Sequence, residues 1–173
     1  MKNQKLFITS LCLLFMGFFS KTTHAQSIET SIGGLLAYGS EIENLGIGVN
    51  AEFGIADNLS ISPSFIYYLP KSYGLFKTNW MEFNANANYY FVNDDKFAVY
   101  GLGGLNYSSI SVKYDREVFG MTGSSSDGRF GLNLGGGANL KLSNDNIIPF
   151  AELKYVIIDG GQLVLAAGVR FKI

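Results

Sequence analysis

The sequence predicts an all-β protein: an eight-stranded antiparallel up-and-down transmembrane β-barrel that follows a cleaved signal peptide. Three observations predict this fold. The chain opens with a basic and then an apolar segment, and from residue 28 onward apolar residues recur at every second position. Short polar turns also alternate with longer connections along the chain. After residue 27 no stretch has the spacing of an amphipathic helix.

Residues 1–25 have the three-part layout of a secretory signal peptide. Residues 1–5 are basic, residues 6–19 are apolar, and Thr23-His24-Ala25 ends the segment with small side chains, so we expect cleavage after Ala25. The apolar run is shorter than the roughly 20 residues that a membrane-spanning helix needs. We therefore expect export from the cytoplasm, with residues 26–173 forming the mature barrel domain.

Composition excludes several classes of function from this mature chain. Cleavage removes three lysines and no acidic residue, which leaves ten basic against fourteen acidic residues and a net charge of −4. No concentrated basic face for nucleic acid is present. The single cysteine, Cys12, and the single histidine, His24, both lie in the signal. We therefore expect no catalytic residue, no cofactor and no metal site.

Four segments alternate clearly between apolar and small or polar residues: 45–55, 81–91, 130–142 and 163–173. Four more are predicted as strands, 28–38, 59–68, 96–107 and 147–157, and the register of 96–107 stays open because Tyr100-Gly101-Leu102-Gly103-Gly104 alternates poorly. Turns at 57–58, 93–95 and 143–146 are short and rich in Asn and Asp, whereas 69–79 and 108–127 are predicted as long loops. Short periplasmic turns and longer outer loops are typical of bacterial outer-membrane barrels.

Side-chain size indicates which face lies outside. Leu, Ile, Val and Phe occupy the apolar face, while Gly, Ser, Asn and Ala dominate the other. An eight-stranded barrel has room inside for small residues and a few long ones, so the bulky face should contact lipid. A soluble lipocalin-like cup would reverse this arrangement. Aromatic girdles are expected near the outer ends at Tyr38, Tyr67, Tyr68 and Trp80, and near the periplasmic ends at Tyr89, Phe91, Phe97 and Phe171.

Residues 28–173 resemble the outer-membrane β-barrel domain of porin-like proteins, the small OmpA/OmpX-type barrels. The resemblance rests on the signal peptide, the eight alternating strands, Tyr100-Gly101-Leu102-Gly103-Gly104 and Pro149-Phe150-Ala151-Glu152-Leu153. The closing residues Val169-Arg170-Phe171-Lys172-Ile173 are similar to the family's terminal assembly signal, although Ile173 replaces the usual Phe. The resemblance implies a Gram-negative outer membrane, insertion by the barrel-assembly machinery, and lipid and lipopolysaccharide as neighbours.

Charged residues on the polar face predict a network in the lumen, made of Glu29, Glu52, Glu82, Arg129, Glu152, Lys154 and Arg170. Glu29 and Arg170 should meet near the periplasmic end, because the first and last strands close the barrel. A proton or ion path and a carboxylate pair for acid–base catalysis are alternatives. Pairing that offsets the cost of burying charge favours a salt-bridge plug.

The outer loops offer Lys71, Lys77, Lys113 and Arg116 as contacts for lipopolysaccharide phosphates or a partner. The sequence favours a monomeric, non-enzymatic barrel with a blocked lumen and a structural or surface-interaction role. A small-solute pore is an alternative, although water-filled channels generally need about sixteen strands. A lipid-modifying enzyme is a weaker alternative, because such enzymes commonly rely on a histidine that the mature chain lacks.

Overall fold

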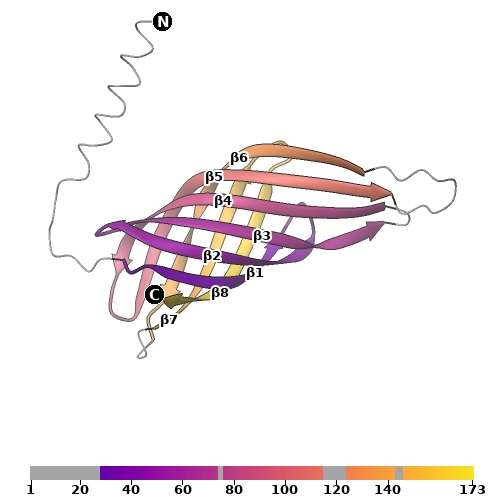
Figure 1. Ribbon diagram of the computed structural model, residues 1–173. Helices are drawn as coiled ribbons and strands as arrows, with labels where there is room; N and C mark the ends of the chain where they lie inside the picture. The colour runs from indigo at the N-terminus through magenta and orange to yellow at the C-terminus, as the bar shows by residue number, and fades with distance from the viewer. Residues whose placement is uncertain (1–27, 74–75, 115–123, 143–145) are drawn as a thin grey trace, which may run out of the picture.

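A computed structural model describes residues 28–73, 76–114, 124–142 and 146–173 (Figure 1). It is a closed antiparallel barrel in which each strand pairs with its neighbours in sequence and β1 pairs with β8. The strands are β1 Ser31–Gly39, β2 Asn44–Ala56, β3 Leu59–Tyr73, β4 Phe76–Asn93, β5 Phe97–Tyr114, β6 Ser124–Leu140, β7 Ile147–Ile157 and β8 Gln162–Lys172. This confirms the predicted eight-stranded all-β barrel. Within the described ranges, no helix is both long enough and apolar enough to span a bilayer.

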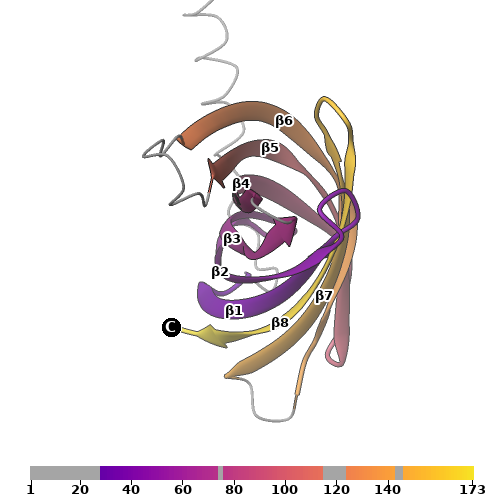
Figure 2. The ribbon, with the colours of Figure 1, turned by 90° about the vertical axis from the view of Figure 1, so that its right-hand side faces the viewer.

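The connections sort to two ends of the barrel. One end, called the turn end below, carries the C-terminus and the connections after β2, β4 and β6 (Figure 1). The opposite end, called the tip end, carries the connections after β1, β3, β5 and β7. Figure 2 looks at the barrel from the tip end and shows the strands wrapping around a common axis.

The tip end differs from the sequence expectation. Much of the predicted loops 69–79 and 108–127 is strand, because β3 continues to Tyr73, β4 starts at Phe76, β5 continues to Tyr114 and β6 starts at Ser124. β4 and β5 each have 18 residues, against about 9–11 for a strand that just crosses a membrane. Backbone pairing continues there although the outward positions Asn79, Ser109 and Ser111 are polar, so sequence periodicity does not reveal it.

The four long strands form a projecting sheet, called the tip sheet below. It consists of residues 69–73 of β3, 76–79 of β4, 106–114 of β5 and 124–131 of β6. The strands on either side of this sheet, β2 and β7, stop pairing with it closer to the turn end. The last pair of β2 with β3 is Gly46 with Tyr68, and the last pair of β7 with β6 is Ile157 with Leu132. Figure 1 shows these strands reaching beyond the rest of the barrel.

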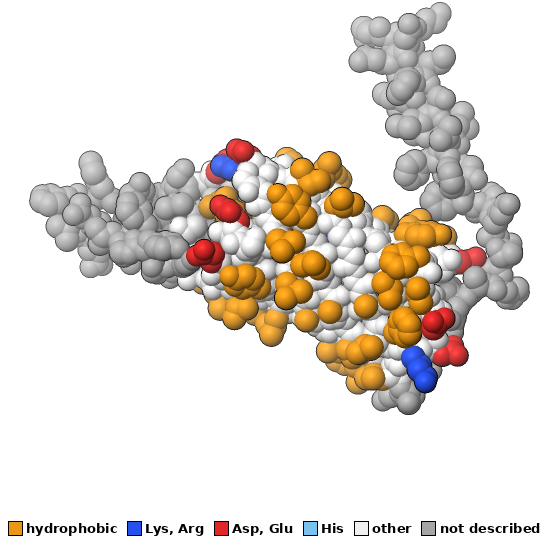
Figure 3. Space-filling model, turned by 180° about the vertical axis from the view of Figure 1, so that it is seen from behind, with side chains coloured by type: hydrophobic (Ala, Val, Ile, Leu, Met, Phe, Trp, Pro, Cys, Tyr) orange, Lys and Arg blue, Asp and Glu red, His pale blue; other side chains and the backbone are white. Residues whose placement is uncertain are grey.

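Bulky apolar side chains cover the outside of the barrel. Exposed examples occur on all eight strands and include Leu36, Val49, Leu105, Leu134 and Leu165, each more than half exposed. Figure 3 shows hydrophobic side chains over the middle of one face and charged ones gathered toward its two ends. A soluble cup would expose the polar face instead, so the lipocalin-like alternative is wrong.

The aromatic residues partly follow the predicted girdles. Tyr38, Tyr89, Phe91, Phe97 and Phe171 are exposed on the outer face. Tyr68 and Trp80 are corrections: Tyr68 is fully buried, and Trp80 packs against a buried cluster inside the barrel. Instead, a row of four rings crosses β3 to β6 on the outer face, with ring centroids 4.8, 6.5 and 4.8 Å apart, in the order Phe65, Phe83, Tyr107 and Phe130.

Candidate functional site

The candidate site is the barrel lumen, where the inward face of every strand meets. Nearest the turn end lies a buried ion pair between Glu52 of β2 and Arg170 of β8, with side chains 2% and 1% exposed. Ser60 and Tyr90 each donate a 2.5 Å hydrogen bond to Oε1 of the same carboxylate, and Asn88 donates one of 3.2 Å. Glu52 is therefore held by four donors from three other strands.

Arg170 has two further contacts, while its buried Nε has no hydrogen-bond partner among the described residues. Its Nη2 donates to Oδ1 of Asn139 at 2.6 Å, and its guanidinium lies 4.4 Å from the centroid of the Phe150 ring. Gly33 lies directly opposite Arg170 in the β1–β8 pair, and a Cβ at Gly33 would come within 2.7 Å of Cγ of Arg170. The absent side chain of Gly33 therefore provides the space for the arginine.

A second buried ion pair lies further toward the tip end. Nζ of Lys154 in β7 is 3.3 Å from Oε2 of Glu82 in β4 and donates a 2.7 Å hydrogen bond to Oδ1 of Asn84. Gln162 and Tyr68 donate to the other oxygen of Glu82 at 2.6 and 3.1 Å. The side chains of this pair are 2% and 0% exposed, so both charges are enclosed by protein.

Asparagines extend this second cluster along the polar side of the lumen. Asn106 and Asn133 each donate to Oδ1 of Asn84 at 2.9 Å, and Asn133 also donates to Oδ1 of Asn86 at 2.8 Å. Alternation along β4 places Asn84, Asn86 and Asn88 on one face, so this strand links the level of Glu82 to the level of Glu52.

Glu152 of β7 shares the inward face with Lys154. Tyr100 donates a 3.1 Å hydrogen bond to its Oε2, and the Tyr100 ring lies 5.1 Å from that of Tyr90. Gly137 makes room for Tyr100, because a Cβ there would collide with the tyrosine hydroxyl. Tyr100 and Leu102 point inward, which settles the register of the 96–107 segment.

An apolar cluster, called the apolar layer below, lies inside the barrel and reaches from Phe150, beside Arg170, to the connections at the tip end. The cluster consists of buried Leu35, Ala37, Ile66, Tyr68, Phe150, Val156, Val164 and Ala166, with Ile42, Trp80 and Ile158 packed against it. Ile42 and Ile158 come from the tip-end connections after β1 and β7. Inward apolar residues at this level were not predicted, although Ile66, Val156 and Val164 have the lumen-facing parity of their strands.

Two predicted lumen residues lie elsewhere. The expected contact between Glu29 and Arg170 is wrong, because Glu29 pairs with Lys172 at 2.6 Å while Arg170 reaches Glu52. Arg129 lies outside the enclosed lumen, with a side chain 41% exposed. It pairs with Asp127 at 2.9 Å and lies 3.8 Å from Asp159 in the connection after β7. β6 has risen into the tip sheet at Arg129, so the barrel no longer surrounds that side chain.

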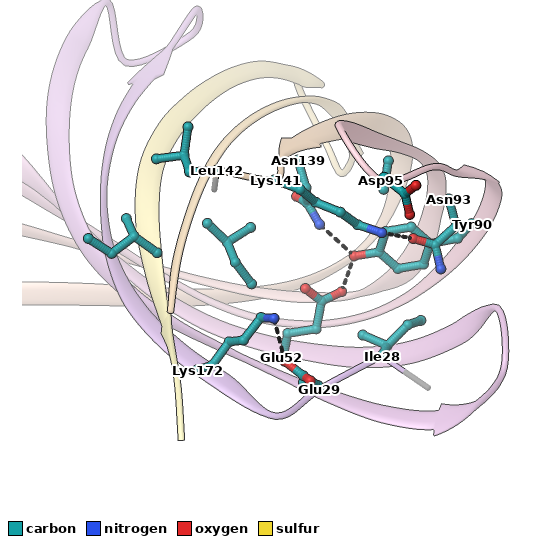
Figure 4. Close-up of a pocket in the computed structure, with 13 residues that line it drawn as sticks. Ile28, Glu29, Glu52, Tyr90, Asn93, Asp95, Asn139, Lys141, Leu142 and Lys172 are labelled. Carbon is teal, nitrogen blue, oxygen red and sulfur yellow. Dashed lines mark hydrogen bonds and ion pairs between the residues drawn. The ribbon is translucent and has the colours of Figure 1, made fainter. Parts of the chain in front are cut away.

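A cavity of about 360 Å³ opens at the turn end (Figure 4). Glu52, Tyr90 and Asn139 line it, with the Glu29–Lys172 pair and Lys141, whose Nζ donates to Oδ1 of Asn93 at 2.8 Å. The cavity therefore meets the first ion-pair cluster and carries charges of both signs. Among the described residues, no three His, Cys, Asp or Glu side chains are grouped so as to hold a metal ion.

The predicted surface contacts belong to the tip end. Backbone register places Lys71 opposite Thr78, and Lys77 opposite both Ser72 and Lys113, so these three lysines share the tip sheet. Arg116 lies outside the described residues.

Solved structures with the same architecture share little sequence with this chain. The attachment invasion locus protein Ail of Yersinia pestis is 19% identical, with a TM-score of 0.56 over 83% of this chain and 97% of that one. The N-terminal barrel of OprF from Pseudomonas aeruginosa is 16% identical, with a TM-score of 0.63 over 86% and 100%. Neisserial surface protein A is 17% identical, with a TM-score of 0.61 over 83% and 96%.

These likenesses establish the fold alone, and no curated protein matches the chain. The sequence profile of the outer membrane protein beta-barrel domain, however, matches residues 12–171, which is most of the chain. Together with the closed barrel and its apolar exterior, this match shows that the chain belongs to the outer membrane protein beta-barrel domain family and is an outer-membrane β-barrel protein.

Proposed function

We propose that this protein is a non-enzymatic outer-membrane barrel with a sealed lumen and a structural or surface-interaction role. The filling of the lumen supports the proposal most directly. Two enclosed ion pairs lie in series along the axis, and the apolar layer packs beside them and continues to the connections at the tip end. Eight strands leave an interior only wide enough for side chains, and here large side chains such as Arg170 and Tyr68 fill it.

The tip sheet supports the surface part of the proposal. Strands that cross a membrane need not extend far beyond it, yet β3 to β6 do. Function in rigid barrels is concentrated on the segments that leave the scaffold. Ail is named an attachment and invasion protein and was also solved with a heparin analogue, which is a precedent within this fold for contact with external partners.

The proposal includes an orientation and a set of neighbours. Residues 1–25 act as an export signal, the turn end faces the periplasm, and the tip end faces outward. The barrel-assembly machinery inserts the chain as a monomer into a Gram-negative outer membrane. Lys71, Lys77, Lys113 and Arg116 then contact lipopolysaccharide phosphates, because lysine and arginine are the side chains that bind phosphate.

A conductance measurement distinguishes the sealed barrel from the alternative of a small-solute pore. The full-length protein, refolded from detergent into planar bilayers, should give no steady single-channel conductance. A parallel sample of a large general porin in the same bilayers controls for reconstitution. A reproducible conductance step that changes with Lys154→Met, which alters a lumen charge, would refute the sealed lumen.

A cell-surface assay tests the surface role. Cells that display the full chain are compared with cells that display a variant in which residues 109–128 are replaced by a short Asn-Gly turn. Heat-modified mobility on gels controls for barrel folding in both. The shortened variant should lose binding to immobilised host-matrix protein or lipopolysaccharide, and equal binding by both would contradict a role for the tip sheet.

A further inference from the structure

The cavity at the turn end has the size and the depth of a small-molecule pocket. Its volume of about 360 Å³ lies within the range of pockets that hold small organic ligands. Its floor includes Glu52, whose carboxylate already accepts four hydrogen bonds from the protein. Behind that floor, the guanidinium of Arg170 and the ring of Phe150 occupy the lumen, so the cavity ends there.

The segment before β1 forms one wall of the cavity and is held in place by the barrel. Ile28 lines the cavity and packs against a buried cluster that includes Ala98. The carbonyl of Thr30 accepts a 3.0 Å hydrogen bond from the backbone N–H of Ile173. Gly54 of β2 leaves room for the segment, because a Cβ at Gly54 would collide with the Ile28 carbonyl. This wall is therefore fixed by contacts within the barrel, and a ligand does not have to order it.

Most charges in the cavity are neutralised within the protein. Glu52 at the floor pairs with Arg170, and Glu29 at the rim pairs with Lys172 at 2.6 Å. A ligand group that replaced a member of either pair would break an existing ion pair to form a new one. These two pairs therefore shape the cavity but leave no charge for a ligand to neutralise.

Two lining charges of opposite sign have no ionic partner in the described part of the chain. Nζ of Lys141 donates a 2.8 Å hydrogen bond to the neutral Oδ1 of Asn93 and lies within ion-pair distance of no described carboxylate. Asp95 is exposed in the connection after β4 and likewise forms no ion pair with a described residue. Figure 4 shows Lys141, Asn93 and Asp95 on the same side of the cavity. That side therefore offers one ammonium group and one carboxylate.

The rest of the lining is rich in apolar side chains. Leu142, Ile147 and Ile148 come from the end of the barrel where β6 connects to β7, and Ile28 adds a further aliphatic side chain. Figure 4 shows Leu142 across the cavity from Asp95. Pockets of this kind, with an apolar lining and a few placed polar groups, take their specificity from the polar groups.

We propose that the turn-end cavity binds a small zwitterion with an apolar body, which is the chemistry of an α-amino acid with an aliphatic side chain. The ligand carboxylate accepts from Lys141, the ligand ammonium group pairs with Asp95, and the aliphatic part contacts Leu142 and Ile148. Both polar contacts are charge-assisted hydrogen bonds, which are the stronger class. A simple anion would leave Asp95 without a partner, and a simple cation would leave Lys141 without one. This proposal goes beyond the proposed function, since it assigns a site at the end opposite the tip sheet.

Equilibrium dialysis of radiolabelled leucine against the full-length protein in lipid nanodiscs tests this proposal, with empty nanodiscs as the control for partition into lipid. Two competitors keep the branched body of leucine. 4-Methylpentanoate lacks the ammonium group, and 3-methylbutylamine lacks the carboxylate. Unlabelled leucine should displace the label at a concentration at least about tenfold lower than either competitor, because one lost hydrogen bond between charged groups is worth about that factor. Photo-leucine, which carries a diazirine in its side chain, should crosslink to peptides that contain Leu142 or Ile148.

Variants of the two unpaired charges test each polar contact separately. Lys141→Gln should weaken leucine binding at least about tenfold and should not weaken binding of 3-methylbutylamine, which has no carboxylate to lose. Asp95→Asn should weaken leucine binding and should not weaken binding of 4-methylpentanoate. Asp94→Asn and Lys96→Gln are matched controls from the same turn. Neither residue lines the cavity, so both variants should bind leucine as the unchanged chain does. Heat-modified mobility on gels controls for barrel folding in all four.

Four results would overturn the inference. They are the absence of saturable leucine binding, displacement by either competitor as effectively as by leucine, crosslinks confined to residues outside the cavity, and unchanged leucine binding in Lys141→Gln. Passage of leucine through the barrel in proteoliposomes would instead contradict the sealed lumen of the proposed function, while leaving the binding site in place.

Discussion

The ion pair between Glu52 and Arg170 gives the sharpest prediction about stability. Replacing Glu52 by leucine leaves a guanidinium that is 1% exposed without its anion, and it also removes the acceptor for Ser60 and Tyr90. Breaking a buried pair by removing one partner costs about 3–5 kcal/mol. We therefore expect Glu52→Leu to lower the free energy of unfolding by about that amount, and Arg170→Met to do the same.

The double variant with Glu52→Leu and Arg170→Met distinguishes the loss of a charge partner from a simple packing defect. With both charges gone, an apolar pair occupies the site, and such replacements are often neutral or stabilising. The double variant should therefore lose less stability than the two single variants together, with a coupling of about 2 kcal/mol or more.

Urea unfolding in phospholipid vesicles measures these differences, with the fluorescence of Trp80, the only tryptophan, as the signal. Equal urea slopes show that the variants unfold between comparable states. Single variants with unchanged midpoints, or a double variant whose loss equals the sum, would refute the argument that the pair is enclosed and coupled.

Three further predictions concern other parts of the barrel. Gly137→Val should destabilise the barrel by about 1–3 kcal/mol, because the new side chain meets the Tyr100 hydroxyl. Gly101→Ala, whose Cβ has its nearest neighbour at 3.8 Å, should have no effect in the same urea assay. Equal losses of stability in the two variants would contradict the assigned register. Leu134→Arg places a charge in the middle of the lipid-facing band and should lower the free energy of unfolding in vesicles by about 2–4 kcal/mol. Ser126→Arg in the tip sheet should lower it by almost nothing. A larger loss for Ser126→Arg than for Leu134→Arg would contradict the assigned position of the membrane. Lys77→Glu with Lys113→Glu should weaken co-purification with lipopolysaccharide, and unchanged co-purification relative to the charge-conserving arginine pair would remove these lysines from the proposed contacts.

The barrel below the tip sheet could be predicted from the sequence, because lipid on one side imposes a strict period. Residues 45–55 and 163–171 keep apolar residues at every odd position, and these lie in β2 and β8 with that face outward. Above the membrane no face has to be apolar. The outward positions Ser109 and Ser111 therefore indicate a loop, although backbone pairing with β4 continues through them.

The partners within the lumen could be predicted only in part. Strand direction correctly indicates the rough height of Arg170, but not which of two nearby carboxylates it meets. Ser31 of β1 lies opposite both Glu52 and Lys172, and Glu29 lies two residues before it. Glu29 and Glu52 therefore lie only about one residue pair apart along the paired strands. The long side chain of Arg170 reaches Glu52, which is the enclosed carboxylate of the two. Lys172, nearer the opening, is left for Glu29.

The apolar layer changes how the proposed seal should be understood. Charged side chains in a lumen can exchange partners, because Lys154 and Arg170 are long and acceptors such as Asn84 and Asn139 lie beside their carboxylates. The side chains of Leu35, Ile66 and Val164 in this layer offer water no polar partner, and the connections after β1 and β7 pack Ile42 and Ile158 against the layer. In the proposed seal, the charges fix the positions of opposite strands, and the apolar layer stays closed to water when an ion pair rearranges.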